Sequence, residues 1–209
     1  MVDEEPTTEA AVAAWISDEL LARDPFVNVA DASDEHRVGH EGCEAFPSRP
    51  GHLFAVLAAS IGARRVLEVG GGLGYSTLWF ASGVGPEGRV ETIEGDATHA
   101  ELLRGAVAAH GYEEAVAVHE GRDADLLATL TGPYDLIFYD AAIPGPELVD
   151  TCERLLRAGG ALLASNIFLG RYVPNHPDLD RGAQFRRRLL DSSGWLASFV
   201  NGKLLAVRR

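Results

Sequence analysis

The chain has 209 residues, 46% of them hydrophobic and 23% charged, as in ordinary globular proteins. This length can bury one sizeable core, so a single domain over residues 1–209 is expected. No run of eighteen apolar residues occurs, which argues against a membrane partner, and the acidic start is unlike a signal peptide. Two cysteines, Cys43 and Cys152, make no disulfide framework, and we expect a cytoplasmic protein.

The formal net charge is -13, and Lys203 is the only lysine in the sequence. Such an acidic surface repels phosphate backbones, so nucleic acid is not an expected partner. An acidic, lysine-poor chain also suits a high-salt cytoplasm, where charge repulsion is screened at short range. That alternative concerns solubility rather than function.

The N-terminal part, residues 1–49, is expected to hold one helix and a lid. Residues 7–22 predict a helix that Pro25 stops, with an apolar face made of Val12, Trp15, Ile16 and Leu20. Residues 26–49 are rich in Asp, His and Gly and are predicted to be irregular, forming a lid over an acceptor pocket. A second helix is predicted to start near Pro50, with an apolar face made of Leu53, Val56, Leu57 and Ile61.

From Arg65 onward the pattern alternates between strands and helices. Strands are predicted at 66–69, 90–93, 115–119, 135–139, 161–164, 195–200 and 203–207. The helix after Pro146 carries Cys152 on its apolar side and should end at Gly159-Gly160, and Asn201-Gly202 predicts a type I′ hairpin turn. These elements indicate an α/β fold: a Rossmann-like, doubly wound, mostly parallel seven-stranded sheet with a C-terminal antiparallel hairpin strand.

The sharpest local signal is the glycine-rich run from Glu68 to Ser76, placed between a strand and a helix. Its spacing does not fit the G-x-G-x-x-G dinucleotide fingerprint, because Tyr75 stands at the third glycine position. Glu68 would repel a pyrophosphate but could help to hold the ammonium end of a zwitterionic ligand. Glu94, at the end of the next strand, is placed to accept hydrogen bonds from both hydroxyls of a ribose.

Four segments carry a family resemblance: the loop 68–74, Glu94, the run 134–140 and the run 162–166. They resemble class I S-adenosylmethionine-dependent methyltransferases, and more narrowly the catechol and caffeoyl-CoA type O-methyltransferases, over residues 46–209. The resemblance implies S-adenosylmethionine as cofactor, S-adenosylhomocysteine as product and a Rossmann-like fold. It also implies a small-molecule acceptor and a homodimer formed through the first helix and the C-terminal region.

The resemblance also assigns site residues. Gly70, Gly72 and Gly74 would border the methionine end of the cofactor, Ser76 would bind its carboxylate, and Tyr75 would lie beside them. Glu94, with Gly95, would hold the ribose, and Gly121, Arg122 and Asp123 would flank the adenine. Asp140 would lie beside the sulfonium and the acceptor, with Asn166 as the second catalytic candidate.

The sequence departs from the family pattern at the residues that bind the metal and at the lysine base. In catechol-type enzymes an Asp and an Asp-Asn pair hold a divalent cation, and a nearby lysine is the base. Here Ser165 replaces the second carboxylate and Ile143 the lysine, which makes a divalent metal doubtful because Mg²⁺ favours carboxylate oxygen. Lys203, just past the Asn201-Gly202 turn, is expected to lie away from the site.

Several side chains remain open alternatives. The acceptor either ionises readily or loses its proton to a histidine, with His176 and His40 as candidates. His36, His40 and Cys43 form a weak zinc pattern, because paired C-x-x-C or helical H-E-x-x-H spacing is absent. Aromatic residues that could line the acceptor pocket are Tyr172, Trp79 and Phe168.

The favoured function is methyl transfer to an oxygen of a small molecule. The alternatives are a protein carboxyl or RNA methyltransferase, a degenerate S-adenosylmethionine-binding protein that has lost catalysis, and an NAD-dependent oxidoreductase.

Overall fold

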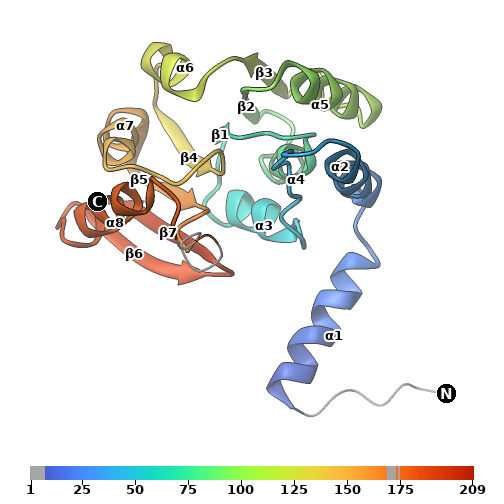
Figure 1. Ribbon diagram of the computed structural model, residues 1–209, viewed down its shortest axis with the longest axis horizontal. Helices are drawn as coiled ribbons and strands as arrows, with labels where there is room; N and C mark the ends of the chain where they lie inside the picture. The colour runs from blue at the N-terminus through green and yellow to red at the C-terminus, as the bar shows by residue number, and fades with distance from the viewer. Residues whose placement is uncertain (1–7, 169–172, 174) are drawn as a thin grey trace.

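The computed structural model describes residues 8–168, 173 and 175–209, and its centre is one seven-stranded sheet (Figure 1). The strand order is β3-β2-β1-β4-β5-β7-β6. The strands are β1 (Arg65–Val69), β2 (Arg89–Glu94), β3 (Val116–Glu120), β4 (Tyr134–Tyr139), β5 (Leu156–Ala164), β6 (Trp195–Val200) and β7 (Lys203–Arg208). The helices are α1 (Glu9–Leu21), α2 (Val27–Gly39), α3 (His52–Ser60), α4 (Tyr75–Gly83), α5 (Ala97–Ala109), α6 (Asp123–Thr129), α7 (Glu147–Leu155) and α8 (Leu179–Leu190).

The sheet is mostly parallel, which confirms the predicted fold class. Strands β1 to β5 pair in parallel, whereas β7 runs antiparallel between β5 and β6. Asn201 and Gly202 at the β6–β7 turn both have positive φ, as a type I′ hairpin requires. The chain adds β2 and β3 on one side of β1 and then returns to add β4 and β5 on the other side. In such sheets ligands bind at this switch point, between β1 and β4.

Both faces of the sheet are covered by helices packed on apolar cores. One core joins α2, α3, α4 and α5 to the sheet and is centred on three aromatic rings, Phe54, Phe80 and Phe138, whose centroids lie 5.0 to 5.6 Å apart. The other joins α6, α7 and α8 to the opposite face and includes Cys152, which is fully buried as expected. No helix in the described ranges is both long and apolar enough to cross a bilayer.

The N-terminal part differs from the prediction in one element. Residues 27–39, expected to be irregular, form α2. Its buried residues are only Val29, Ala30 and Ser33, so the apolar stripe is too short and too polar to produce a clear helical pattern in the sequence. The helix is stabilised by contacts outside itself, which the sequence pattern does not display.

Two predicted helical faces also need correction. The first helix forms as α1 but buries no residue: Trp15 is 41% and Ile16 46% exposed, and the helix stands away from the body (Figure 1). In α3 the buried residues are Phe54 and Ala58, whereas Val56, expected on the apolar face, is 63% exposed.

The fifth strand begins earlier than predicted. Helix α7 ends at Leu155 and β5 starts at Leu156, so Gly159 and Gly160 lie inside the strand rather than ending the helix. The register of β5 against β4 shifts there, from Tyr134↔Leu156 to Leu136↔Ala161. This irregularity accommodates the two glycines within the strand.

Candidate functional site

A cavity of about 890 Å³ lies at the carboxyl ends of the central strands. Its size suits a small-molecule ligand. The predicted residues that line it are Gly70, Gly72, Tyr75, Ser76, Glu94, Gly95, Arg122, Asp123, Asp140 and Asn166. Glu68, Gly74 and Gly121 do not line it. Residues 44–48, which follow α2, border the cavity, so the segment expected to act as a lid lies beside it.

The glycines of the loop allow neighbouring groups to come close to its backbone. Gly70, Gly72 and Gly74 have φ values of 93°, 52° and 101°, a region that side chains disfavour. A Cβ on Gly70 would lie 2.8 Å from the carbonyl carbon of Asp140, so the loop packs directly on the end of β4. Helix α4 starts directly after Gly74, and the amides of its first turn favour an anionic group such as a carboxylate.

Glu94 is oriented by two backbone amides. Its Oε2 accepts a hydrogen bond from the Gly72 amide at 2.7 Å, and its Oε1 accepts one from the Asp96 amide at 2.9 Å. The carboxylate is buried yet lines the cavity. Because a carboxylate can accept about four hydrogen bonds, it retains acceptor capacity for ligand hydroxyls.

Glu68 lies behind the loop rather than in the cavity. Its Oε2 accepts hydrogen bonds from the hydroxyls of Thr77 and Thr92, the second at 2.8 Å. Its Oε1 is buried and has no hydrogen-bond partner among the described residues. Full burial raises the pKa of Glu68 to about 7. The carboxyl therefore braces β1 against α4 and β2, a contact that motif reading did not anticipate.

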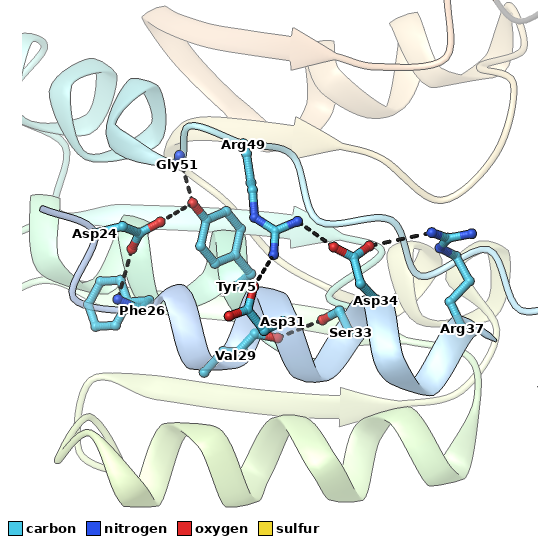
Figure 2. Close-up of polar contacts among 10 residues, drawn as sticks. All are labelled: Asp24, Phe26, Val29, Asp31, Ser33, Asp34, Arg37, Arg49, Gly51 and Tyr75. Carbon is cyan, nitrogen blue, oxygen red and sulfur yellow. Dashed lines mark hydrogen bonds and ion pairs between the residues drawn. The ribbon is translucent and has the colours of Figure 1, made fainter. Parts of the chain in front are cut away.

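Tyr75 connects the glycine-loop helix to the N-terminal segment (Figure 2). Its hydroxyl accepts a hydrogen bond from the Gly51 amide at 3.0 Å and donates one to Asp24. Asp24 also accepts a hydrogen bond from the Phe26 amide, just before α2. The hydroxyl is thus already paired within the protein, although the ring borders the cavity.

Arg49 holds the segment after α2 against that helix (Figure 2). Its guanidinium pairs with Asp31 at 2.8 Å and with Asp34 at 2.5 Å. The hydrogen bond from Arg49 keeps the pKa of Asp34 below its ordinary value. These ion pairs position the cavity-lining residues 44–48 relative to α2.

The predicted adenine end is more open. Asp123 accepts hydrogen bonds from the Ala124 amide at 2.8 Å and from the Tyr139 hydroxyl at 3.3 Å. The Arg122 side chain is exposed. Gly121 has a φ of 146°, and its amide donates to the Glu94 carbonyl at 2.9 Å, which joins the ends of β2 and β3.

Asp140 and Asn166 meet at the end of the cavity that is predicted to hold the acceptor. The Asn166 amide nitrogen lies 3.5 Å from Asp140 Oδ1. Asn166 has a φ of 59°, a conformation uncommon outside glycine and typical of constrained positions at sites. Burial raises the pKa of Asp140 to about 6, and Lys203 opposes that rise. A carboxylate is thus held near a cation in a desolvated place.

Lys203 is in this cavity, so the expectation that it lies away from the site is wrong. The reason is the register of the hairpin: β7 pairs antiparallel with β5, with Leu204 opposite Ala164. The first residue of β7 therefore lies beside Ser165, at the carboxyl end of β5. Burial lowers the pKa of Lys203, and Asp140 opposes the shift. The antiparallel direction of β7 was the signal from which the position of Lys203 in the cavity could have been predicted.

The donor set at Asp140 does not fit a divalent cation. It offers one carboxylate, the Asn166 amide and the hydroxyl of Ser165, whose Oγ is buried without a hydrogen-bond partner in the described ranges. Mg²⁺ favours one or two carboxylates, and Lys203 lines the same cavity, where its protonated form would repel a divalent cation. Ile143, at the family's lysine position, is buried.

The remaining candidate side chains lie in different places. His176 and Phe168 line the cavity, and Trp79 is buried in the core, whereas Tyr172 lies outside the described residues. His40 stacks on His36 with ring centroids 4.0 Å apart.

Comparison with known proteins agrees with this geometry. The family described as O-methyltransferase matches residues 42–190. A Mycobacterium tuberculosis protein named catechol O-methyltransferase is 35% identical over 189 residues, covering 88% of this chain and 83% of that protein. The solved structure of the O-methyltransferase TomG from Streptomyces achromogenes, in complex with S-adenosylmethionine, is 30% identical with a TM-score of 0.79, covering 95% of this chain and 96% of that chain.

A Bacillus cereus O-methyltransferase solved with S-adenosylhomocysteine gives the same TM-score, 0.79, at 25% identity, covering 95% of this chain and 97% of that chain. The family match spans well over half of this chain, and the fold and cavity agree with it. The chain therefore belongs to the O-methyltransferase family and is an S-adenosylmethionine-dependent methyltransferase.

Proposed function

We propose that the enzyme methylates a hydroxyl of a small aromatic acceptor, such as a catechol or another acidic phenol, without a divalent cation at Asp140. The observation that carries this proposal is the group formed by Asp140, Asn166 and Lys203 in the same cavity as the glycine loop. The name of the M. tuberculosis relative, catechol O-methyltransferase, supports the acceptor class. The weak donor set at Asp140 supports the absence of a metal.

The cofactor end of the cavity would hold S-adenosylmethionine, which when bound supplies an electrophilic methyl group for in-line displacement. Glu94 would accept hydrogen bonds from the ribose hydroxyls, and Ser76 with the first turn of α4 would receive the carboxylate. Arg122 and Asp123 would flank the adenine. Gly70 and Gly72 would leave room for the methionine portion. Glu68 would act through the loop that it braces.

The acceptor end would supply position and a base. Asp140 and Asn166 would orient the acceptor hydroxyl, because they offer an acceptor and a donor within 3.5 Å of each other. Lys203, as a neutral amine, would take the hydroxyl proton, and its desolvation favours that form. Holding the two reactants in line contributes a large part of such a reaction's rate.

Calorimetric titration with S-adenosylhomocysteine tests the cofactor assignment. We expect micromolar binding to the wild-type protein, at moderate and high salt, that is abolished by Glu94→Ala. Glu87→Ala is the matched control, because Glu87 is an exposed carboxylate outside the cavity that pairs with Arg64 at 3.4 Å. No binding at any salt concentration would refute the cofactor site.

Turnover tests the acceptor and metal assignments. Release of S-adenosylhomocysteine should be measured over a panel of catechols and phenols, with added Mg²⁺ or with no metal added. We expect equal rates in both conditions. A rate that requires Mg²⁺ would refute the metal-independent proposal.

We also propose a homodimer and no nucleic-acid partner. The exposed Trp15 and Ile16 of α1, and the exposed Leu196 and Phe199 on the edge strand β6, would be covered by a second copy. The net charge of -13 disfavours nucleic acid, and the free Cys43 and Cys152 are in keeping with a cytoplasmic location. Sedimentation showing a monomer at micromolar concentration would remove the dimer.

A further inference from the structure

Three potential metal ligands converge beside the cofactor cavity: His36 of α2, Cys43 of the segment after it, and His99 of α5. One ligand atom from each lies within 4.8 Å of the others. His99 Nε2 is 3.2 Å from His36 Nε2 and 3.5 Å from Cys43 Sγ. The predicted zinc pattern named His40 in place of His99; the fold instead stacks His40 on His36 and brings in a residue 56 positions beyond Cys43.

Two of these separations match the edges of a tetrahedral zinc site, and the third, between His36 and Cys43, is at most 4.8 Å. With Zn–N near 2.0–2.1 Å and Zn–S near 2.3 Å, tetrahedral angles place two nitrogens about 3.3 Å apart and a nitrogen and a sulfur about 3.6 Å apart. The observed 3.2 Å and 3.5 Å fall close to both values. Hydrogen bonding alone would give His99 Nε2 two partners for its one proton or lone pair.

The surroundings prepare the side chains for a metal. The His36 ring stacks on His40 with centroids 4.0 Å apart and meets the His99 ring edge-on with centroids 5.0 Å apart, so its orientation is fixed by packing. The other ring nitrogen of His99, Nδ1, lies 3.7 Å from Glu94 Oε1. Metal-bound histidines usually donate this second ring N–H to a carboxylate, and Glu94 lies on that side of the His99 ring, beyond hydrogen-bond distance.

We propose that His36, Cys43 and His99 bind Zn²⁺, with a fourth position left to water. A mixed thiolate and imidazole set favours zinc over Mg²⁺ or Ca²⁺. Cys43 loses its thiol proton on binding, so zinc affinity falls as the pH is lowered. The ion joins α2, the lid segment and α5 at one point. Zinc therefore clamps the lid beside Glu94, the residue proposed to hold the ribose.

The direct test is metal binding by tag-free, full-length protein after chelator treatment. We expect one tightly bound Zn²⁺ per chain, and Co²⁺ in its place should give tetrahedral visible bands with a thiolate-to-metal charge-transfer band. Cys43→Ser should remove the charge-transfer band and weaken zinc binding more than about 100-fold, since even residues beyond the ligands contribute 10–100-fold. His36→Ala should weaken zinc binding similarly.

His40→Ala is the matched control, because His40 touches the cluster without belonging to it. It should keep the zinc stoichiometry and the Co²⁺ spectrum. Absence of stoichiometric zinc, or a charge-transfer band that survives Cys43→Ser, would overturn the proposal. Equal zinc binding by wild type and His36→Ala would do the same. These readouts need neither cofactor nor turnover, so they stand or fall separately from the methyl-transfer proposal.

Discussion

Replacing Lys203 gives the sharpest test of how the acceptor loses its proton. Lys203→Met removes the amine, whose Nζ lies 5.8 Å from the centroid of the Phe54 ring, and keeps much of the apolar stem. General-base catalysis contributes about 10²–10⁴-fold, or about 3–5 kcal/mol of barrier. We expect that loss in kcat/KM and unchanged affinity for S-adenosylhomocysteine, because the cofactor end of the cavity is untouched.

The pH dependence follows from the state of the amine. A neutral Lys203 is the active form, so the wild-type rate should rise with pH until its lowered pKa is passed. Asp140 has a pKa of about 6, so its negative charge is lost as the pH falls below that value, and the rate should drop further there. Lys203→Met should lose the upper dependence on pH and keep the lower one.

Two comparisons distinguish a role of Lys203 as a general base from a role of its positive charge. Lys203→Arg keeps the positive charge but cannot deprotonate near neutral pH, so it should be as slow as Lys203→Met. Acceptors with strongly acidic phenols, already ionised in the assay, should react equally well with wild type and variants. The assay is release of S-adenosylhomocysteine across the phenol series. A wild-type rate for Lys203→Arg would refute the base, and a wild-type rate for Lys203→Met would refute any role.

Three further substitutions test the scaffold of the site. Burial raises the pKa of Glu68 from 4.5 to about 7, so protonation of Glu68 favours the folded state and the stability of the wild type declines as the pH rises between these values. Glu68→Gln should therefore be more stable than wild type near pH 8, by up to about 3 kcal/mol in urea unfolding. Near pH 4 the two proteins should be equally stable. Tyr75→Phe leaves a buried amide and Asp24 without their shared partner and should cost about 1–3 kcal/mol, measured the same way. Gly70→Ala places a Cβ at a position with positive φ and against the end of β4. Its control is Gly85→Ala, at a position that also has positive φ but has open space around it. Calorimetry should show that Gly70→Ala loses S-adenosylhomocysteine binding and that Gly85→Ala keeps it.

The fold could be predicted because its signals are local. Alternating strands and helices after Arg65, the glycine run from Glu68 and the Asn201-Gly202 turn are each set by residues close in sequence. Right-handed crossovers then leave few ways to arrange a parallel sheet. The predicted ends of β1, β2 and β4 consequently brought Gly70, Glu94 and Asp140 to one cavity.

The features that were not predicted depend on contacts between residues far apart in the sequence. Helix α2 depends on the contacts of Asp24 and Arg49 with distant residues, and its own stripe is weakly apolar. Glu68 looked like a ligand-binding residue because it belongs to the motif, but strand alternation turns it away from the cavity toward Thr77 and Thr92. His99 joins His36 and Cys43 only through folding. Sequence spacing contains none of these long-range pairings.

The position of Lys203 shows that an amine can reach this cavity without the lysine of the family motif. The carboxyl edge of a parallel sheet is reached from the ends of parallel strands and equally from the beginning of an antiparallel one, such as β7. The family's lysine position is held by Ile143, which packs so closely on α8 that a Cβ on Gly182 would lie 2.7 Å from it. A lysine there would have to displace that contact. Placing the amine at the start of β7 brings a cation to the same cavity and leaves the α8 packing intact.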